Sequence, residues 1–151
     1  MNVELRRDLV VLACGISAGI HAALGPHHFH EAVGEGLGFL GAALALSALV
    51  VALTLRPASV TALAGAAIVL AGSVVAYCLA ITTGVPLLLP EPESIDGLAL
   101  ATKAIEGVGL VAALGLIGRG TATRPAPLFL TTLVALFSAL VSLALAQGHM
   151  H

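Results

Sequence analysis

The chain has 151 residues, of which 59% are hydrophobic and 9% are charged, with a formal net charge of -2 and a mean hydropathy of +1.09. This composition leaves too little polar surface to coat a water-soluble globule, so it excludes a soluble domain. The sequence also has no basic patch for nucleic acid. We therefore expect an all-α integral membrane protein in a lipid bilayer.

Apolar runs predict five transmembrane helices in one bundle, and a single membrane domain over residues 1–151. In chain order the predicted spans are about 8–24, 34–55, 58–83, 98–117 and 128–146. The second span ends where Arg56 meets Pro57, and the stretch 84–97 is a predicted loop because it holds three prolines and three acids. The first span is short, so its ends should lie in the headgroup region or in a protein-lined cavity.

The charges predict the orientation of this bundle. With five spans, five arginines fall on one side, which the positive-inside rule makes cytoplasmic: Arg6, Arg7, Arg56, Arg119 and Arg124. Histidines and acids share the opposite side: His27, His28, His30, Glu31, Glu35, Glu91, Glu93, Asp96, His149 and His151. We expect a multi-pass plasma-membrane protein with a cytoplasmic N-terminus and an extracytoplasmic C-terminus. A first helix lying in the interface would leave four spans and scramble this partition.

The stretch from Pro26 to Glu31 carries three histidines and a carboxylate in a chain otherwise rich in Ala, Leu, Val and Gly. Pro26 suits the first position of a helix, where no amide hydrogen is needed. If the second helix begins there, His28, Glu31 and Glu35 share one of its faces, because their spacing is three and then four residues. This face would then carry both imidazole and carboxylate ligands.

Imidazole with carboxylate suits Zn, Fe, Mn or Cu(II), so the stretch predicts a transition-metal site. Further ligands would come from His21 and from the His149-Met150-His151 tail, whose thioether favours copper slightly over zinc or iron. The alternative is that these histidines are solvated loop residues without a metal. The metal candidates are His21, His28 and Glu106 as the core, with His27, His30, Glu31, Glu35, His149 and His151 around it.

Lys103 and Glu106 lie inside the fourth predicted span, where neither can face lipid cheaply. Their spacing of three residues allows an internal salt bridge that fixes the helix register. Alternatively Glu106 faces inward and meets His21, which lies at a similar depth. A carboxylate beside an imidazole can orient a metal ligand or hold a proton.

Other cofactors and cross-links are not expected. The sequence has no glycine-rich phosphate loop for a nucleotide and no Ser-centred nucleophile elbow. Haem is not expected, because only His21 approaches the depth of an axial ligand. Cys14 and Cys78 fall at different depths, so no disulfide is predicted between them. Glycine pairs four residues apart favour tight packing within the monomer over a dimer interface.

Several of these motifs resemble a group of small multi-helix membrane proteins from actinobacteria. The motifs are a His that closes the first helix, a Pro-x-His, a Gly-x-Pro…Pro-Glu loop and a Glu inside the fourth helix. The resemblance covers about residues 20–111, and the matching positions are His21, Pro26, His28, Pro86 and Glu106. It implies a helical membrane fold and a candidate trio of His21, His28 and Glu106, but no reaction.

Three functions are compatible with the sequence. The first is a membrane protein with a His/Glu transition-metal site near the extracytoplasmic face, for metal binding, delivery or redox support. The second is a metal-free structural or assembly subunit, in a homo-oligomer or a larger membrane complex. The third is a membrane enzyme or carrier that uses Glu106 and His21 as a proton relay, which requires a cavity reaching their depth.

Overall fold

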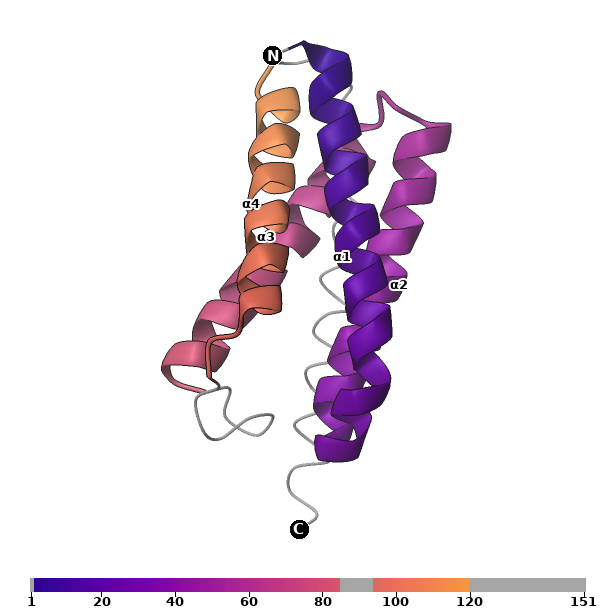
Figure 1. Cartoon of the computed structure of the whole chain (residues 1–151). Coiled ribbons are helices and arrows are strands. Elements are labelled where there is room, and N and C mark those ends of the chain that lie inside the picture. Colours follow the sequence, from indigo (N-terminus) through magenta and orange to yellow (C-terminus); the bar gives the residue numbers. More distant parts are fainter. Residues whose placement is uncertain (1, 85–93, 120–151) are drawn as a thin grey trace.

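The structure, a computed structural model, describes residues 2–84 and 94–119, most of which are helical (Figure 1). This part contains no strand and has four helices, each long and apolar enough to cross a membrane. They are α1 (Val3–Glu31), α2 (Val33–Leu55), α3 (Val60–Thr82) and α4 (Gly97–Ile117), arranged as a bundle (Figure 1). For the described residues this confirms the prediction of an all-α chain whose helices are long and apolar enough to span a membrane. The predicted fifth span at 128–146 lies outside the described residues.

Polar side chains set the start of three helices. The Leu5 amide donates to Asn2 Oδ1 at 2.8 Å at the start of α1, and the Leu98 amide donates to Asp96 Oδ1 at 2.6 Å at the start of α4. Ser59 caps α3 in the same manner. Each cap satisfies an amide that has no partner within the helix.

Helix α1 is longer than predicted, and the prediction that Pro26 opens the second helix is wrong. Pro26 lies inside α1, which continues to Glu31 and is about 43 Å long at 1.5 Å per residue. Membrane helices tolerate an internal proline because surrounding groups can satisfy the carbonyl that it frees. The helix ends at Ala32, whose extended backbone (φ -152°, ψ 122°) makes the turn into α2. His27, His28 and His30 therefore lie on the last turns of α1.

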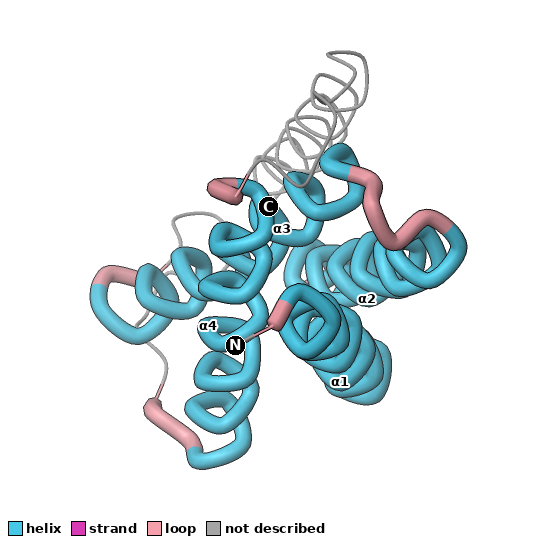
Figure 2. Tube along the Cα trace, turned by 90° about the horizontal axis from the view of Figure 1, so that it is seen from above, coloured by secondary structure: helices cyan, strands magenta, loops and turns pink. Residues whose placement is uncertain are grey.

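Helix α1 packs between α2 and α4, while α3 packs against α4 and makes a smaller contact with α2 (Figure 2). The α1–α4 crossing is close because a Cβ at Gly109 would overlap the Cβ of Ala13. Cys14 is buried in the core and Cys78 is exposed, and both are free thiols. The largest fully buried apolar side chains are Leu46, Leu53, Leu70 and Val10.

The charged residues separate between the two ends of the bundle. The start of α1, the α2–α3 turn and the end of α4 lie at the same end, which carries all the described arginines (Figure 1): Arg6, Arg7, Arg56 and Arg119. The α1–α2 turn and the start of α4 lie at the other end, which carries His27, His28, His30, Glu35 and Asp96.

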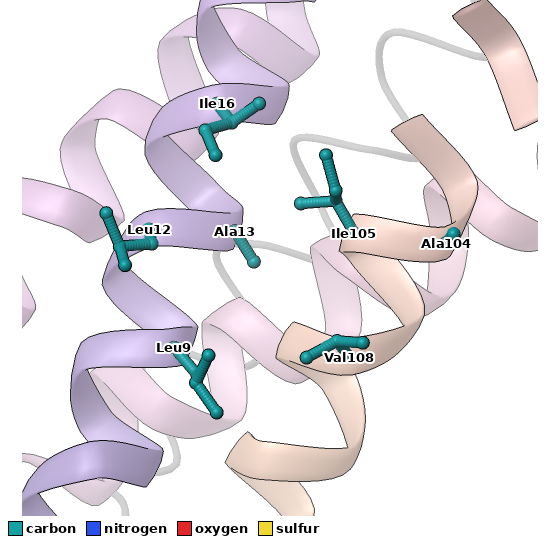
Figure 3. Close-up of a pocket in the computed structure, with 7 residues that line it drawn as sticks. All are labelled: Leu9, Leu12, Ala13, Ile16, Ala104, Ile105 and Val108. Carbon is teal, nitrogen blue, oxygen red and sulfur yellow. The ribbon is translucent and has the colours of Figure 1, made fainter. Parts of the chain in front are cut away.

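Apolar side chains cover much of the outer surface of the bundle, as a bilayer requires. A groove of about 330 Å³ between α1 and α4 is lined only by apolar residues (Figure 3). They are Leu9, Leu12, Ala13, Ile16, Ala104, Ile105 and Val108.

Candidate functional site

One face of α1 carries the candidate site. Along this face, side chains three or four residues apart point the same way and are buried. Its first half is apolar, with Val10 and Cys14, and its second half is polar, with Ser17, His21 and then His28. The polar half therefore runs through the bundle interior from the middle of α1 towards the α1–α2 turn.

Glu106 on α4 is fully buried and accepts hydrogen bonds from three helices. Its Oε1 accepts from the Ser17 hydroxyl of α1 at 2.5 Å and from the Ser73 hydroxyl of α3 at 3.2 Å. Its Oε2 lies 2.7 Å from Lys103 Nζ, so the predicted salt bridge between residues three apart is confirmed. A buried carboxylate is costly unless it is paired and hydrogen-bonded, and these contacts meet both conditions.

Lys103 also contacts α3. Its Nζ donates to Ser73 Oγ at 3.3 Å and lies 5.9 Å from the centroid of the Tyr77 ring. The Tyr77 hydroxyl oxygen is buried and has no hydrogen-bond partner among the described residues. The ammonium is thus held by a carboxylate, a hydroxyl and an aromatic face within the bundle.

His21 reaches Glu106 through Ser17. The His21 Nδ1 atom lies 2.8 Å from the Ser17 carbonyl oxygen and 3.2 Å from Ser17 Oγ. The sequence predicted a direct meeting of His21 and Glu106, whereas the structure places the Ser17 hydroxyl between them. We call Ser17, His21, Ser73, Lys103 and Glu106 the Glu106 network.

A second polar pair lies nearer the α1–α2 turn. His28 Nδ1 is 2.6 Å from Glu35 Oε1, and the two side chains are 16% and 7% exposed. We call these two residues the outer pair. A carboxylate on Nδ1 fixes the orientation of the imidazole ring, as it does in many metal and proton-transfer sites.

The predicted trio of His21, His28 and Glu106 faces the interior, but its members do not meet at one point. The Ser17 hydroxyl lies between Glu106 and His21, and the Phe39 ring contacts both His21 and His28. Among the described residues no group of three or more His, Cys, Asp or Glu side chains is arranged to hold a metal ion.

The remaining metal candidates lie around the trio or outside the described part of the chain. His27 and His30 are exposed on α1, and the His27 ring meets the His28 ring edge-on at 5.8 Å. The Glu31 side chain and the tail residues His149 and His151 lie outside the described part.

Sequence reasoning missed Ser17, Ser73, Tyr77 and Phe39. The spacing along α1 could have identified Ser17 as an inward-facing residue. Ser17 lies one helical turn before His21, and Cys14 lies on the same face of the helix. Ser73 and Tyr77 are isolated polar residues in an apolar helix, and only the packing of α3 on α4 brings them to Lys103. Phe39 looked like any apolar residue of α2.

Comparison with known proteins does not assign this chain to a family or a function. The resemblance to actinobacterial membrane proteins therefore stays a prediction, and the geometry above is what bears on function. No protein-family model, curated protein or solved structure matches this chain.

Proposed function

We propose that this multi-pass membrane protein uses the Glu106 network as an intramembrane proton relay for a carrier or a membrane enzyme. The observation that carries the proposal is the Ser17 hydroxyl, which donates to Glu106 and lies 3.2 Å from the His21 ring nitrogen. Ionisable residues within a membrane span are rare and mark proton or substrate pathways by default. Here a carboxylate and an imidazole are joined by a group that both donates and accepts a proton.

The relay step follows from these contacts. A proton that binds His21 Nε2 gives an imidazolium with hydrogen on both ring nitrogens. The Nδ1 proton then passes to Ser17 Oγ while the Ser17 hydroxyl proton passes to Glu106 Oε1. His21 returns to the neutral form with its hydrogen on Nε2, Ser17 is unchanged, and Glu106 becomes the neutral acid.

Lys103 couples this step to a change of charge. Protonation of Glu106 leaves the Lys103 ammonium, 2.7 Å away, without its counter-charge inside the bundle. An unbalanced charge is unfavourable in this low-dielectric setting. The charge of Lys103 must then be balanced again, either by release of the proton from Glu106 or by an anion that takes the place of the carboxylate. The network can thereby link proton movement to the binding of a substrate.

The arginine end of the bundle supports an orientation for the relay. Arginines at one end and histidines with acids at the other fit a cytoplasmic N-terminus, by the positive-inside rule. Protons would then enter the relay from the extracytoplasmic end, where the outer pair lies.

The experiment is a proton-flux assay on the purified full chain in liposomes that contain a pH-sensitive dye. Glu106→Gln should lower the proton flux at least tenfold, and Ser17→Ala should also lower it. The matched control is Glu4→Gln, the same chemical change at an exposed position in the first turn of α1. A folded Glu106→Gln variant with the flux of the unchanged protein would overturn the relay and leave the network a structural role.

A second candidate, a transition-metal site at the same end, is favoured by the outer pair. The carboxylate of Glu35 holds the His28 ring by Nδ1, the arrangement that orients many metal-bound imidazoles. Further ligands would come from His27 and His30 or from Glu31, His149 and His151, and copper is favoured slightly over zinc or iron. Elemental analysis of tag-free protein tests this: stoichiometric metal should be lost in the His28→Ala/Glu35→Ala variant.

A further inference from the structure

Phe39 of α2 occupies the space between the two imidazoles of α1. Its ring is stacked on His28 with a centroid distance of 4.2 Å and an interplanar angle of 14°. The same ring meets the His21 ring at 5.3 Å with a tilt of 40°. His21 and His28 are two helical turns apart on one face of α1, about 10 Å along its axis, so a proton cannot pass directly between them.

Gly25 lies beside Phe39. It lies on α1 between His21 and His28, and a Cβ there would meet the Phe39 Cβ at 3.7 Å, an ordinary van der Waals distance. Helices α1 and α2 therefore pack closely where the Phe39 ring contacts the two imidazoles. The sequence of α1 thus provides two imidazoles with a gap between them, and α2 provides the ring that fills it.

We propose that Phe39 is a gate, which closes the path between the outer pair and the Glu106 network. The inference rests on the proposed relay and specifies how that relay is regulated. In the closed arrangement the apolar ring excludes water from the gap, so no chain of water molecules joins the outer pair to His21. Aromatic side chains change rotamer, and such a change of Phe39 would let water connect the two imidazoles.

Different groups face the two imidazoles. His28 is faced by Glu35 from α2, by the edge of His27 on α1 and by the face of Phe39.

His21 is faced by different groups. Ser17 contacts it directly, and Glu106 and Lys103 of α4 follow beyond the Ser17 hydroxyl. The gate therefore separates a compartment open to the membrane surface from one inside the bundle.

The test uses two measurements on the full chain. The first is hydrogen–deuterium exchange of the His21 ring N–H, followed by NMR of 15N-histidine-labelled protein in nanodiscs. The second is proton flux in liposomes. Phe39→Ala should speed exchange at His21 at least tenfold and raise the flux at least threefold. Phe39→Leu, which preserves more of the packing, should give a smaller change in the same direction.

Phe29 provides the matched control. It lies near the same end of the bundle, and its ring packs against Gly36 of α2. Phe29→Leu should leave exchange at His21 and proton flux at the values of the unchanged protein. Unchanged exchange at His21 in both folded Phe39 variants would overturn the gate.

The two proposals fail in different ways. If Glu106→Gln lowers the flux but the Phe39 variants change neither measurement, the relay stands and the gate is overturned. If Glu106→Gln leaves the flux unchanged while Phe39→Ala speeds exchange at His21, the relay is overturned, and Phe39 remains the barrier between His21 and the surface.

Discussion

The Ser17 hydroxyl of α1 donates a 2.5 Å hydrogen bond to the Glu106 carboxylate of α4, and both side chains are fully buried. The two residues are 89 positions apart in the chain. Through this bond the α1 face that also carries His21 and His28 is joined to the Lys103–Glu106 ion pair of α4. Stability and function should both depend on it.

Breaking the ion pair from one side should destabilise the bundle. Glu106→Gln leaves the Lys103 ammonium without a counter-charge, which costs about 3–5 kcal/mol for a buried pair. Replacing both residues, as Lys103→Met with Glu106→Leu, should restore most of that loss because no charge remains buried. Unfolding in mixed micelles measures the difference. A double variant no more stable than Glu106→Gln would contradict the prediction.

The two serines that donate to Glu106 should differ in their contribution. Ser17→Ala removes the shorter, fully buried bond to a charged acceptor and should cost about 2 kcal/mol. Ser73→Ala removes a 3.2 Å bond and should cost about 0.6 kcal/mol, the average for bonds between membrane helices. The same unfolding measurement ranks them. Equal losses would show that bond length and burial do not set the order.

Two glycines on α4 provide a packing test. Gly109→Ala places a Cβ against Ala13 and should force α1 and α4 apart, at a cost of about 1–3 kcal/mol. Gly107→Ala on the same helix points into open space, with no atom within 4 Å, and should be neutral or slightly stabilising because alanine favours helix. Thermal stability of the two variants in detergent is the comparison. A destabilised Gly107→Ala would argue against this packing.

The proposed orientation can be tested with single cysteines in a background where Cys14 and Cys78 are replaced by alanine. Ser94→Cys, before α4, should react with a membrane-impermeant maleimide added to intact cells. Ala58→Cys, in the exposed α2–α3 turn, should react only after the membrane is opened. The reverse pattern would place the arginine end outside and invert the entry side of the relay.

Much of the fold follows from local patterns. Long apolar runs predict membrane helices because the bilayer forces the backbone to satisfy its own hydrogen bonds. The Lys103–Glu106 salt bridge follows from a spacing of three residues on one helix. The length of α1 did not follow, because Pro26 commonly opens a helix and only its surroundings in the bundle allow it inside one.

The sequence by itself determined the class of this protein, the ionisable residues inside its spans and the separation of arginines from histidines. These features depend on composition and on short spacings within one helix. Only the tertiary structure decided which groups meet: Ser17 and Ser73 on Glu106, Glu35 on His28, and Phe39 between the two imidazoles. Such contacts depend on how the helices rotate and pack against one another, which arises from side-chain packing across the whole bundle and not from a local pattern.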